Sequence, residues 1–327
     1  GEAVPRRYQV SAVTCTRELG RIPSASLRLV DGVPAGGSFP ASDSDLFVPG
    51  KTLEVLLGYN SEERPVFSGL IVRQGLRARE GSGPSLQIEC RDPAVKMCME
   101  RRSRYFQEVS DSDMAAEIVG EYGLGTAIDS TAVTHPELVQ FEATDWDFAI
   151  SRLEANGLLC LAVEGKLAAF APDTAQQPAL ELEYGATLLA FDTELDAVTQ
   201  PAAVKGFSWD PAAQEQVEVE AADPGIQEAG NLSASELTAA LGQNRRHAHG
   251  GRLSGEEAQA WADARLQRDR LARLRARVSV QGIAEIAPGQ VVGLAGVGER
   301  FSGPLLVSGV RHRVSAGSWI TDLQLGP

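Results

Sequence analysis

Short segments in which apolar and polar residues alternate account for most of this chain. In residues 53–57 (LEVLL) and 86–90 (LQIEC), apolar side chains recur mostly at every second position, as in strands with one buried face. The 33 Gly and 17 Pro residues between such segments favour turns. The first part of the chain is therefore predicted to be β, with strands at residues 7–16, 25–30, 52–58, 66–79 and 85–91.

The period becomes that of helices after about residue 92. Ser110 is placed to cap a helix that Gly123 ends, and Thr144, with Asp147 three residues later, is placed to cap a second helix that ends at Asn156. The apolar faces expected to be buried contain Met114, Ile118 and Tyr122 in the first helix and Trp146, Ala149, Ile150 and Leu153 in the second. A strand pair follows, so the middle of the chain is predicted to be a small α+β unit.

Strand patterns return after residue 178, and a helical segment interrupts them. Ser254 and Glu257 are spaced as a capping box, which predicts one long helix after a polar loop that starts near residue 231. Arginines gather toward the end of this helix, where they are expected to complement its dipole and favour solubility: Arg265, Arg268, Arg270, Arg273 and Arg275.

Two segments far apart in the chain follow the same order of motifs. Pro49-Gly50 corresponds to Pro288-Gly289, and residues 67–69 (FSG) correspond to residues 301–303 (FSG). The distance from the first to the last glycine is shorter by five residues in the second copy, which fits a shortened turn. Chance similarity between two β segments is the alternative to an internal repeat.

Each copy predicts a strand entered through a Pro-Gly turn, a hairpin, a long strand and a return strand. A few antiparallel strands with one apolar face gain stability by closing, so each copy is predicted to form a small barrel. The matched positions belong to the framework rather than to a site, and they are Gly50 and Gly289, Phe67 and Phe301, and Gly69 and Gly303. The fold class is thus mainly β, with two related small antiparallel β-barrels, an α+β middle unit and a helical insertion.

The predicted domains follow these patterns. A first β-barrel domain covers 1–96, an α+β middle domain covers 97–178, and a second β-barrel domain covers 179–327 with the helical insertion at about 232–275. At roughly 100 to 200 residues per domain, a length of 327 residues allows two or three such domains.

Composition excludes several classes of function. Lys and Arg number 30 against 44 Asp and Glu, and the net charge of −14 argues against a nucleic-acid or anionic-membrane partner. No uncharged apolar stretch approaches the ~18 residues of a membrane span, so we expect a soluble protein without a membrane-spanning segment. The four cysteines are too few and scattered for a disulfide scaffold, which favours a reducing compartment: Cys15, Cys90, Cys98 and Cys160.

Candidate catalytic and metal-binding residues have structural explanations that we prefer. Asp145 and Asp147 form a carboxylate pair suited to acid–base work, but their place at a helix start is explained by the helix dipole. His247-Ala-His249 is spaced like a metal motif, yet it lies in a Gly-rich polar loop without a nearby acidic or Cys ligand. His135 and His312 stand elsewhere in the chain.

Other chemical motifs are missing from the sequence. There is no dinucleotide fingerprint, no Walker-type Gly-Lys-Ser/Thr and no Gly-x-Ser-x-Gly elbow. The tryptophans fall in different elements and are expected to anchor cores or interfaces rather than to form a sugar-stacking platform: Trp146, Trp209, Trp261 and Trp319. The sequence therefore assigns no catalytic, cofactor-binding or metal residue, and we expect no enzymatic activity and no cofactor.

Several phrases spread over nearly the whole chain carry a resemblance to a known family. They are Pro49-Gly50 with Phe67-Ser68-Gly69, VSDSDMAAEIVGEYGL from residue 109, VQFEATDWDFAISRLEANGLLCLAVEGKLAAF from residue 139, SGEEAQAWADARL from residue 254 and the closing segment from residue 288. The most specific piece is Thr144-Asp-Trp-Asp-Phe148, an acidic-aromatic helix opening. By these phrases the chain resembles the phage late control protein D family and the related N-terminal part of VgrG, the hub and spike-base proteins of contractile injection machines.

The resemblance implies a ring of three subunits, each giving two similar barrels to a pseudo-sixfold torus. Such a homotrimer presents six near-equivalent surfaces to a hexameric tube protein while it keeps threefold symmetry for a spike or needle module. It also implies baseplate proteins as partners, assembly in the cytoplasm, and later residence in a phage-tail-like particle or secretion on firing. VgrG proteins continue into a further barrel and a needle, so the spike is either a separate chain, as with late control protein D, or lies beyond Pro327.

Two hypotheses from different classes remain. The favoured one is a structural hub that adapts the hexameric inner tube of a phage tail, type VI secretion system or extracellular injection particle to its trimeric central spike. The alternative is a cell-wall or polysaccharide-acting β-rich hydrolase or carbohydrate-binding protein, suggested by the acidic residues and tryptophans.

Overall fold

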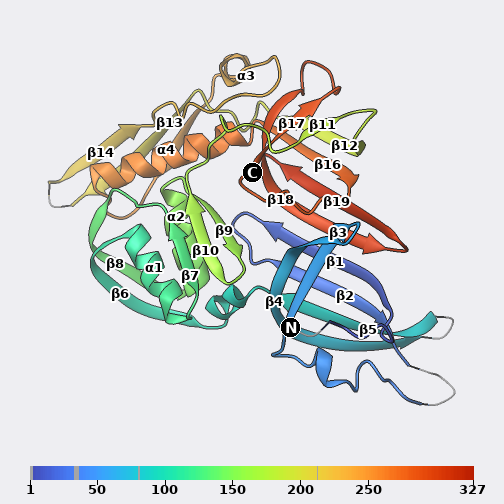
Figure 1. Ribbon diagram of the computed structural model, residues 1–327. Helices are drawn as coiled ribbons and strands as arrows, with labels where there is room; N and C mark the ends of the chain where they lie inside the picture. The colour runs from blue at the N-terminus through green and yellow to red at the C-terminus, as the bar shows by residue number, and fades with distance from the viewer. Residues whose placement is uncertain (1–2, 33–36, 80–81, 212) are drawn as a thin grey trace.

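The first part of the chain forms antiparallel strands, as the alternating pattern predicts (Figure 1). The computed structural model describes residues 3–32, 37–79, 82–211 and 213–327. Within these, the strands of the first part are β1 (Val10–Glu18), β2 (Ser24–Val30), β3 (Thr52–Tyr59), β4 (Glu62–Arg79) and β5 (Ser82–Arg91).

The last part of the chain returns to the same sheet. Its strands are β11 (Glu181–Glu183), β12 (Leu188–Leu195), β16 (Leu274–Gln281), β17 (Val291–Ala295), β18 (Gly303–Ser315) and β19 (Ser318–Leu325). The hydrogen-bonded order is β12-β16-β19-β18-β1-β2-β5-β4-β3, and β17 pairs with both β18 and β11. The mainly β fold class with antiparallel sheets is confirmed, and the two β units are joined through β1 and β18 into one sheet.

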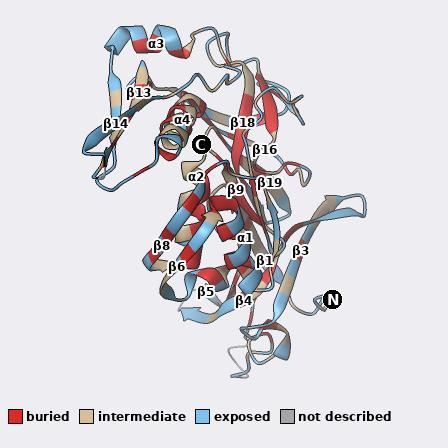
Figure 2. Cartoon of the chain, turned by 90° about the vertical axis from the view of Figure 1, so that its left-hand side faces the viewer, coloured by how far each residue is buried: buried red, intermediate tan, exposed pale blue. Residues whose placement is uncertain are grey.

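Each β unit keeps a core of its own, because alternate residues of its strands turn to one side. In the first unit the core includes Leu29, Phe47 and Ile88, and in the last unit it includes Leu182, Val307 and Leu323. Figure 2 shows buried positions along β16 and β18, whereas much of β3 is exposed.

The α+β middle unit lies between them in sequence. Its elements are β6 (Arg101–Ser110), α1 (Asp111–Glu121), β7 (Gly125–Ile128), β8 (Thr134–Thr144), α2 (Asp145–Ala155), β9 (Leu159–Val163) and β10 (Lys166–Phe170). Both predicted helices are confirmed, with the Ser110 and Thr144 side chains accepting from the backbone N–H three residues on. Their apolar faces meet in a core that contains Met114, Ile118 and Leu153.

The sequence patterns missed β6 and β8, which pair with each other as a two-stranded ribbon. Phe106 and Leu138 point into the middle core, but Tyr105 and Val139 on the other face are 68% and 58% exposed. Apolar residues on both faces remove the alternation that identifies a half-buried strand.

The insertion near residues 232–275 has more structure than one helix. It contains α3 (Ala234–Leu241), β15 (Asn244–Ala248) and α4 (Gly255–Leu271), and β15 adds in parallel to β13 (Ala203–Asp210), which also pairs with β14 (Glu215–Glu220). Helix α4 lies across this small sheet (Figure 1), with Ala262 and Leu266 packed against Val204. Over the described residues, no helix combines the length and the apolar composition that crossing a membrane requires.

Two predictions about α4 need correction. Ser254 caps the helix by accepting from Glu257 N–H, but the Glu257 side chain turns to Arg152 instead of completing a capping box; that box occurs at Ser233 and Glu236 of α3. Arg273 does not serve solubility, because it is buried beyond the helix end and its guanidinium donates to the carbonyl of Ala229 at 2.5 Å. The loop carbonyls need donors that only a tertiary contact supplies.

Candidate functional site

The strand order repeats within the chain. In the first β unit the hydrogen-bonded order is β3-β4-β5-β2-β1, and in the last unit it is β17-β18-β19-β16-β12. We call each of these a strand frame. The correspondence supports the internal repeat that the sequence indicates.

The Pro-Gly turns enter the two frames in the same way. Gly50 N–H donates to the Ile71 carbonyl at 2.8 Å, and Gly289 N–H donates to the Val307 carbonyl at 2.8 Å. The residue after each glycine, Lys51 or Gln290, accepts from Ile71 or Val307 N–H, again at 2.8 Å. The glycine φ values are 97° and 91°, a region that a side chain makes costly, so the match of Gly50 with Gly289 is confirmed.

The frames also share β-bulges at equivalent places. One extra residue, Val72, interrupts the ladder of β4 with β5 directly after Ile71, and Ser308 interrupts that of β18 with β19 directly after Val307. A second bulge falls at Ser11 in β1 and at Leu189 in β12. Because a bulge changes which face the following side chains occupy, shared bulges fix the same register in both frames.

This register corrects the other two predicted matches. With Ile71 equivalent to Val307, Gly69 corresponds to Leu305 and Gly303 to Phe67. Phe67 is buried inside β4, whereas Phe301 lies in the turn before β18. The second hairpin is shorter by three residues rather than five, so the Phe-Ser-Gly phrases occupy different points of the two frames.

The two frames meet head to tail. β1 of the first frame pairs antiparallel with β18 of the second, from Ala12 opposite Ser315 to Glu18 opposite Gly309. Beside this ladder the Tyr59 and Trp319 rings lie 5.0 Å apart between centroids. The contact joins different edges of the two frames and therefore has a direction.

The two aspartates weighed as a catalytic pair have separate roles. Asp147 is exposed and accepts at 2.8 Å from the hydroxyl of its N-cap, Thr144. Asp145 is completely buried and accepts from Arg104 at 3.0 Å, from the Tyr122 hydroxyl at 2.7 Å and from Gln140 at 2.8 Å. Burial, and then the bond to Asp145, raise the pKa of Tyr122 to about 12. The geometry gives Asp145 a structural role in holding β6 and β8 to the helices.

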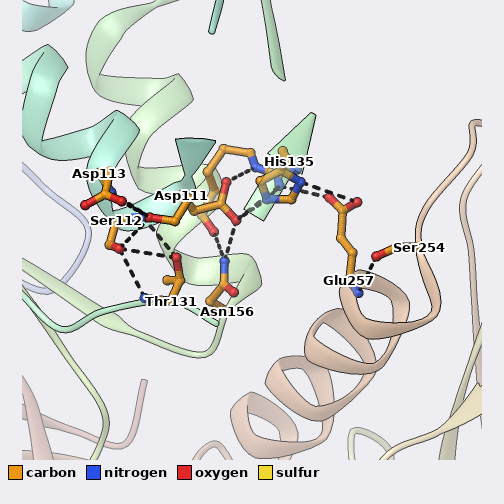
Figure 3. A network of polar contacts seen from close by, with 10 residues as sticks. Asp111, Ser112, Asp113, Thr131, His135, Asn156, Ser254 and Glu257 are labelled. Carbon is orange, nitrogen blue, oxygen red and sulfur yellow. Dashed lines mark hydrogen bonds and ion pairs between the residues drawn. The ribbon is translucent and has the colours of Figure 1, made fainter. Parts of the chain in front are cut away.

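A larger buried ionic network links the middle unit to α4 (Figure 3). Arg152 donates to both carboxylate oxygens of Asp111, at 2.6 and 3.1 Å, and to Glu257 at 2.8 Å. His135 lies between the two acids, with its Nε2 3.1 Å from Asp111 and its Nδ1 3.8 Å from Glu257. Asn156 donates to Asp111 at 2.8 Å.

The network is a structural tie by its geometry. Burial alone would raise the pKa of Asp111, but hydrogen bonds from His135 and Arg152 hold it below its ordinary value. Each charged group satisfies another across α1, β8, α2 and α4, so the network fixes these elements to one another. Sequence reasoning missed this set because its members span 146 residues and only folding brings them together.

The remaining histidines are dispersed. His247 and His249 flank the Trp261 ring at centroid distances of 6.0 and 5.2 Å, and His312 Nδ1 lies 3.0 Å from the Thr321 hydroxyl. Across the part of the chain that the structure describes, His, Cys, Asp and Glu do not form a cluster of three or more suited to a metal ion.

The tryptophans occupy four separate surroundings. Trp146 lies in the middle core, Trp261 lies beside the histidines and Trp319 lies against Tyr59, while Trp209 is 52% exposed. A hollow of about 410 Å³ between α2 and α4 is lined by several charged residues, and its carboxylates pair with arginines: Glu154 with Arg268 and Asp269 with Arg265. These positions are typical of packing anchors rather than of a sugar platform.

Solved structures of tail proteins share this fold. A prophage MuSo2 43 kDa tail protein from Shewanella oneidensis matches with a TM-score of 0.69 and 12% identity over 97% of this chain and 93% of that one. A tail protein from Neisseria meningitidis MC58 matches with a TM-score of 0.70 and 16% identity, over 98% and 92% of the two chains.

A secretion protein has the same architecture. The E. coli c3393 protein, described as a component of the type VI secretion system with structural similarity to T4 bacteriophage tail proteins gp27 and gp5, matches with a TM-score of 0.61 and 10% identity over 100% of this chain and 75% of that one. At identities this low, the structural matches show a shared fold and nothing more.

Sequence comparison gives a family of a different name from the one that the sequence phrases resemble. No curated protein matches the chain. The family model described as the Alg8 N-terminal domain matches residues 1–316, almost the whole length, and its description names no activity. The chain belongs to the Alg8 N-terminal domain family.

Proposed function

We propose that this chain is a structural hub of a contractile injection machine, and that the Alg8 N-terminal domain family is related to late control protein D and VgrG. In this role three copies form a ring that adapts a hexameric inner tube to a trimeric central spike, with baseplate proteins around it. The subunit works by shape and strand edges, without catalysis. It assembles in the cytoplasm and then stays in a tail-like particle or is secreted on firing.

The observation that carries the proposal is the duplicated strand frame. Two copies with equivalent glycine turns and equivalent bulges lie in one chain. A trimer of such a chain offers six similar units to a sixfold partner and still has three identical subunits for a threefold one. The tail-protein fold supports the same role.

We also propose the domain division at 1–96, 97–178 and 179–327. It is supported by separate clusters of buried residues in the first, middle and last parts of the chain. The middle domain would then be a unit attached outside the strand frames and held to α4 by the ionic network.

Sedimentation equilibrium of the full chain tests the hub. We expect a species of three times 34.8 kDa, a threefold ring in electron micrographs, and binding to a hexameric inner-tube protein. A strict monomer at high concentration that binds no tube protein would refute the proposal. Retention on peptidoglycan, or its turnover, would instead favour the hydrolase or carbohydrate-binding alternative.

A further inference from the structure

The head-to-tail contact between the two frames leaves the opposite edges open. Inside the chain, β1 of the first frame pairs with residues 309–315 of β18 in the second. In the second frame β12 holds the place that β1 holds in the first. In the first frame the second half of β4 holds the place of residues 309–315 of β18. Over the described residues, β12 forms a ladder only with β16, and β4 beyond Ile71 forms a ladder only with β5.

The ladders define which residues of these open edges are equivalent to the internal joint. Thr14 and Asp192 hold the same place, because each lies directly before the residue opposite the matched alanines of β2 and β16. Arg77 and Arg313 hold the same place, six residues after Ile71 and Val307. In the internal joint Thr14 lies opposite Arg313, so the same joint between two copies places Asp192 opposite Arg77.

Charge is complementary at this proposed contact. On β12, Asp192 and Glu194 are exposed, and on β4, Arg73 and Arg77 are exposed. Oppositely charged residues that face each other across antiparallel strands stabilise the pairing, and like charges oppose it. Within the chain Asp192 and Glu194 already lie opposite Arg277 and Arg275 of β16, so the proposed contact adds Arg77 as a second cation on the open side of Asp192.

Burial also differs between the two joints. Leu76 is equivalent to His312; Leu76 is 44% exposed, whereas His312, covered by β1, is 5% exposed. A long open strand edge with exposed apolar residues is a site where another strand can add. A second copy of this chain carries the strand that fits it.

We propose that residues 190–195 of one subunit pair antiparallel with residues 74–79 of a second copy, with Asp192 opposite Arg77. The inference rests on the proposed hub and specifies how its ring closes. Because the contact joins different edges, it is heterologous and continues from copy to copy until the rotation closes. Internal and intersubunit joints then alternate around one continuous strand ring.

Charge exchange tests this pairing. Asp192→Arg and Arg77→Asp each place like charges in the joint, so each single variant should raise the concentration at which half the trimer dissociates by at least about tenfold. The double variant restores an opposite pair and should return the trimer to near its original stability. Glu117→Arg, an equal charge change at an exposed position of α1, should leave the trimer intact.

Engineered disulfides give an independent readout. In a Cys98→Ser background, Asp192→Cys with Arg77→Cys, and Thr193→Cys with Leu76→Cys, place thiols on neighbouring opposed pairs. At least one pair should give covalent dimers and trimers under mild oxidation on denaturing gels. Asp192→Cys with Arg73→Cys, which is out of register, should not.

The outcomes separate the pairing from the hub. If the wild-type chain forms a trimer but neither charge exchange nor the in-register cysteines affect or link it, the pairing is wrong and the hub stands. If the wild-type chain stays monomeric at high concentration, the hub and the pairing fail together. Dissociation by both single variants, with recovery in the double variant, supports the pairing.

Discussion

The two glycines that open the strand frames offer an internal comparison of backbone strain with packing. Gly50 and Gly289 have φ values of 97° and 91° and make the same 2.8 Å bond to the long strand that follows. Their surroundings differ. A Cβ at Gly289 would lie 2.5 Å from the Phe170 ring, whereas among the described residues nothing lies within 4 Å of a Cβ at Gly50.

Alanine at both sites should therefore separate the two costs. The unusual φ costs about 1–3 kcal/mol at either position. At Gly289 the methyl group also overpacks the Phe170 ring, which adds about 1–3 kcal/mol. We expect Gly50→Ala to lower the free energy of unfolding by about 1–3 kcal/mol and Gly289→Ala to lower it by about 2–6 kcal/mol.

Urea unfolding followed by circular dichroism and tryptophan fluorescence measures both losses, provided that the slopes stay equal. Phe170→Leu removes the ring that the new methyl group would meet. The double variant Gly289→Ala with Phe170→Leu should therefore lose less than the sum of the two single variants. Equal losses for Gly50→Ala and Gly289→Ala, together with additive behaviour at Phe170, would show that the ring contact does not govern this turn.

Three further predictions concern buried groups. Arg152→Met leaves the carboxylates of Asp111 and Glu257 buried without their shared cation and should lower the free energy of unfolding by about 3–5 kcal/mol. Adding Asp111→Asn and Glu257→Gln to the Arg152→Met variant should restore most of this loss, and urea unfolding measures both effects. Burial lowers the pKa of His312 from 6.5 to about 4, so the unfolded chain gains a proton at a higher pH than the folded chain does. The stability present above pH 6.5 should therefore fall by about 3 kcal/mol as the pH drops to 4. His312→Leu should remove this pH dependence, and an unchanged dependence would contradict the assignment. Cys98 is the exposed thiol among four free cysteines, so it should react first with a thiol reagent, the other three reacting only on unfolding; early labelling of more than one thiol per chain would contradict the burial.

Much of the fold was predictable from local pattern. The alternating segments identified the strands of the first β unit within a few residues, because one buried face imposes a period of two. Ser110 and Thr144 marked the starts of α1 and α2, because an orphan N–H at a helix start selects a short polar side chain. The ribbon of β6 and β8 was missed because its two faces are both partly apolar.

The repeated strand frames were also predictable from the sequence only in part. The Pro49-Gly50 and Pro288-Gly289 phrases marked equivalent turns, since only glycine adopts that φ at low cost, but the Phe-Ser-Gly phrases that were read with them gave the wrong alignment. Local sequence records which backbone conformations and buried faces a segment needs. It does not record which edges meet, so the joining of β1 to β18, the register set by the bulges and the burial of Glu257 beside Arg152 were decided only when distant segments packed together.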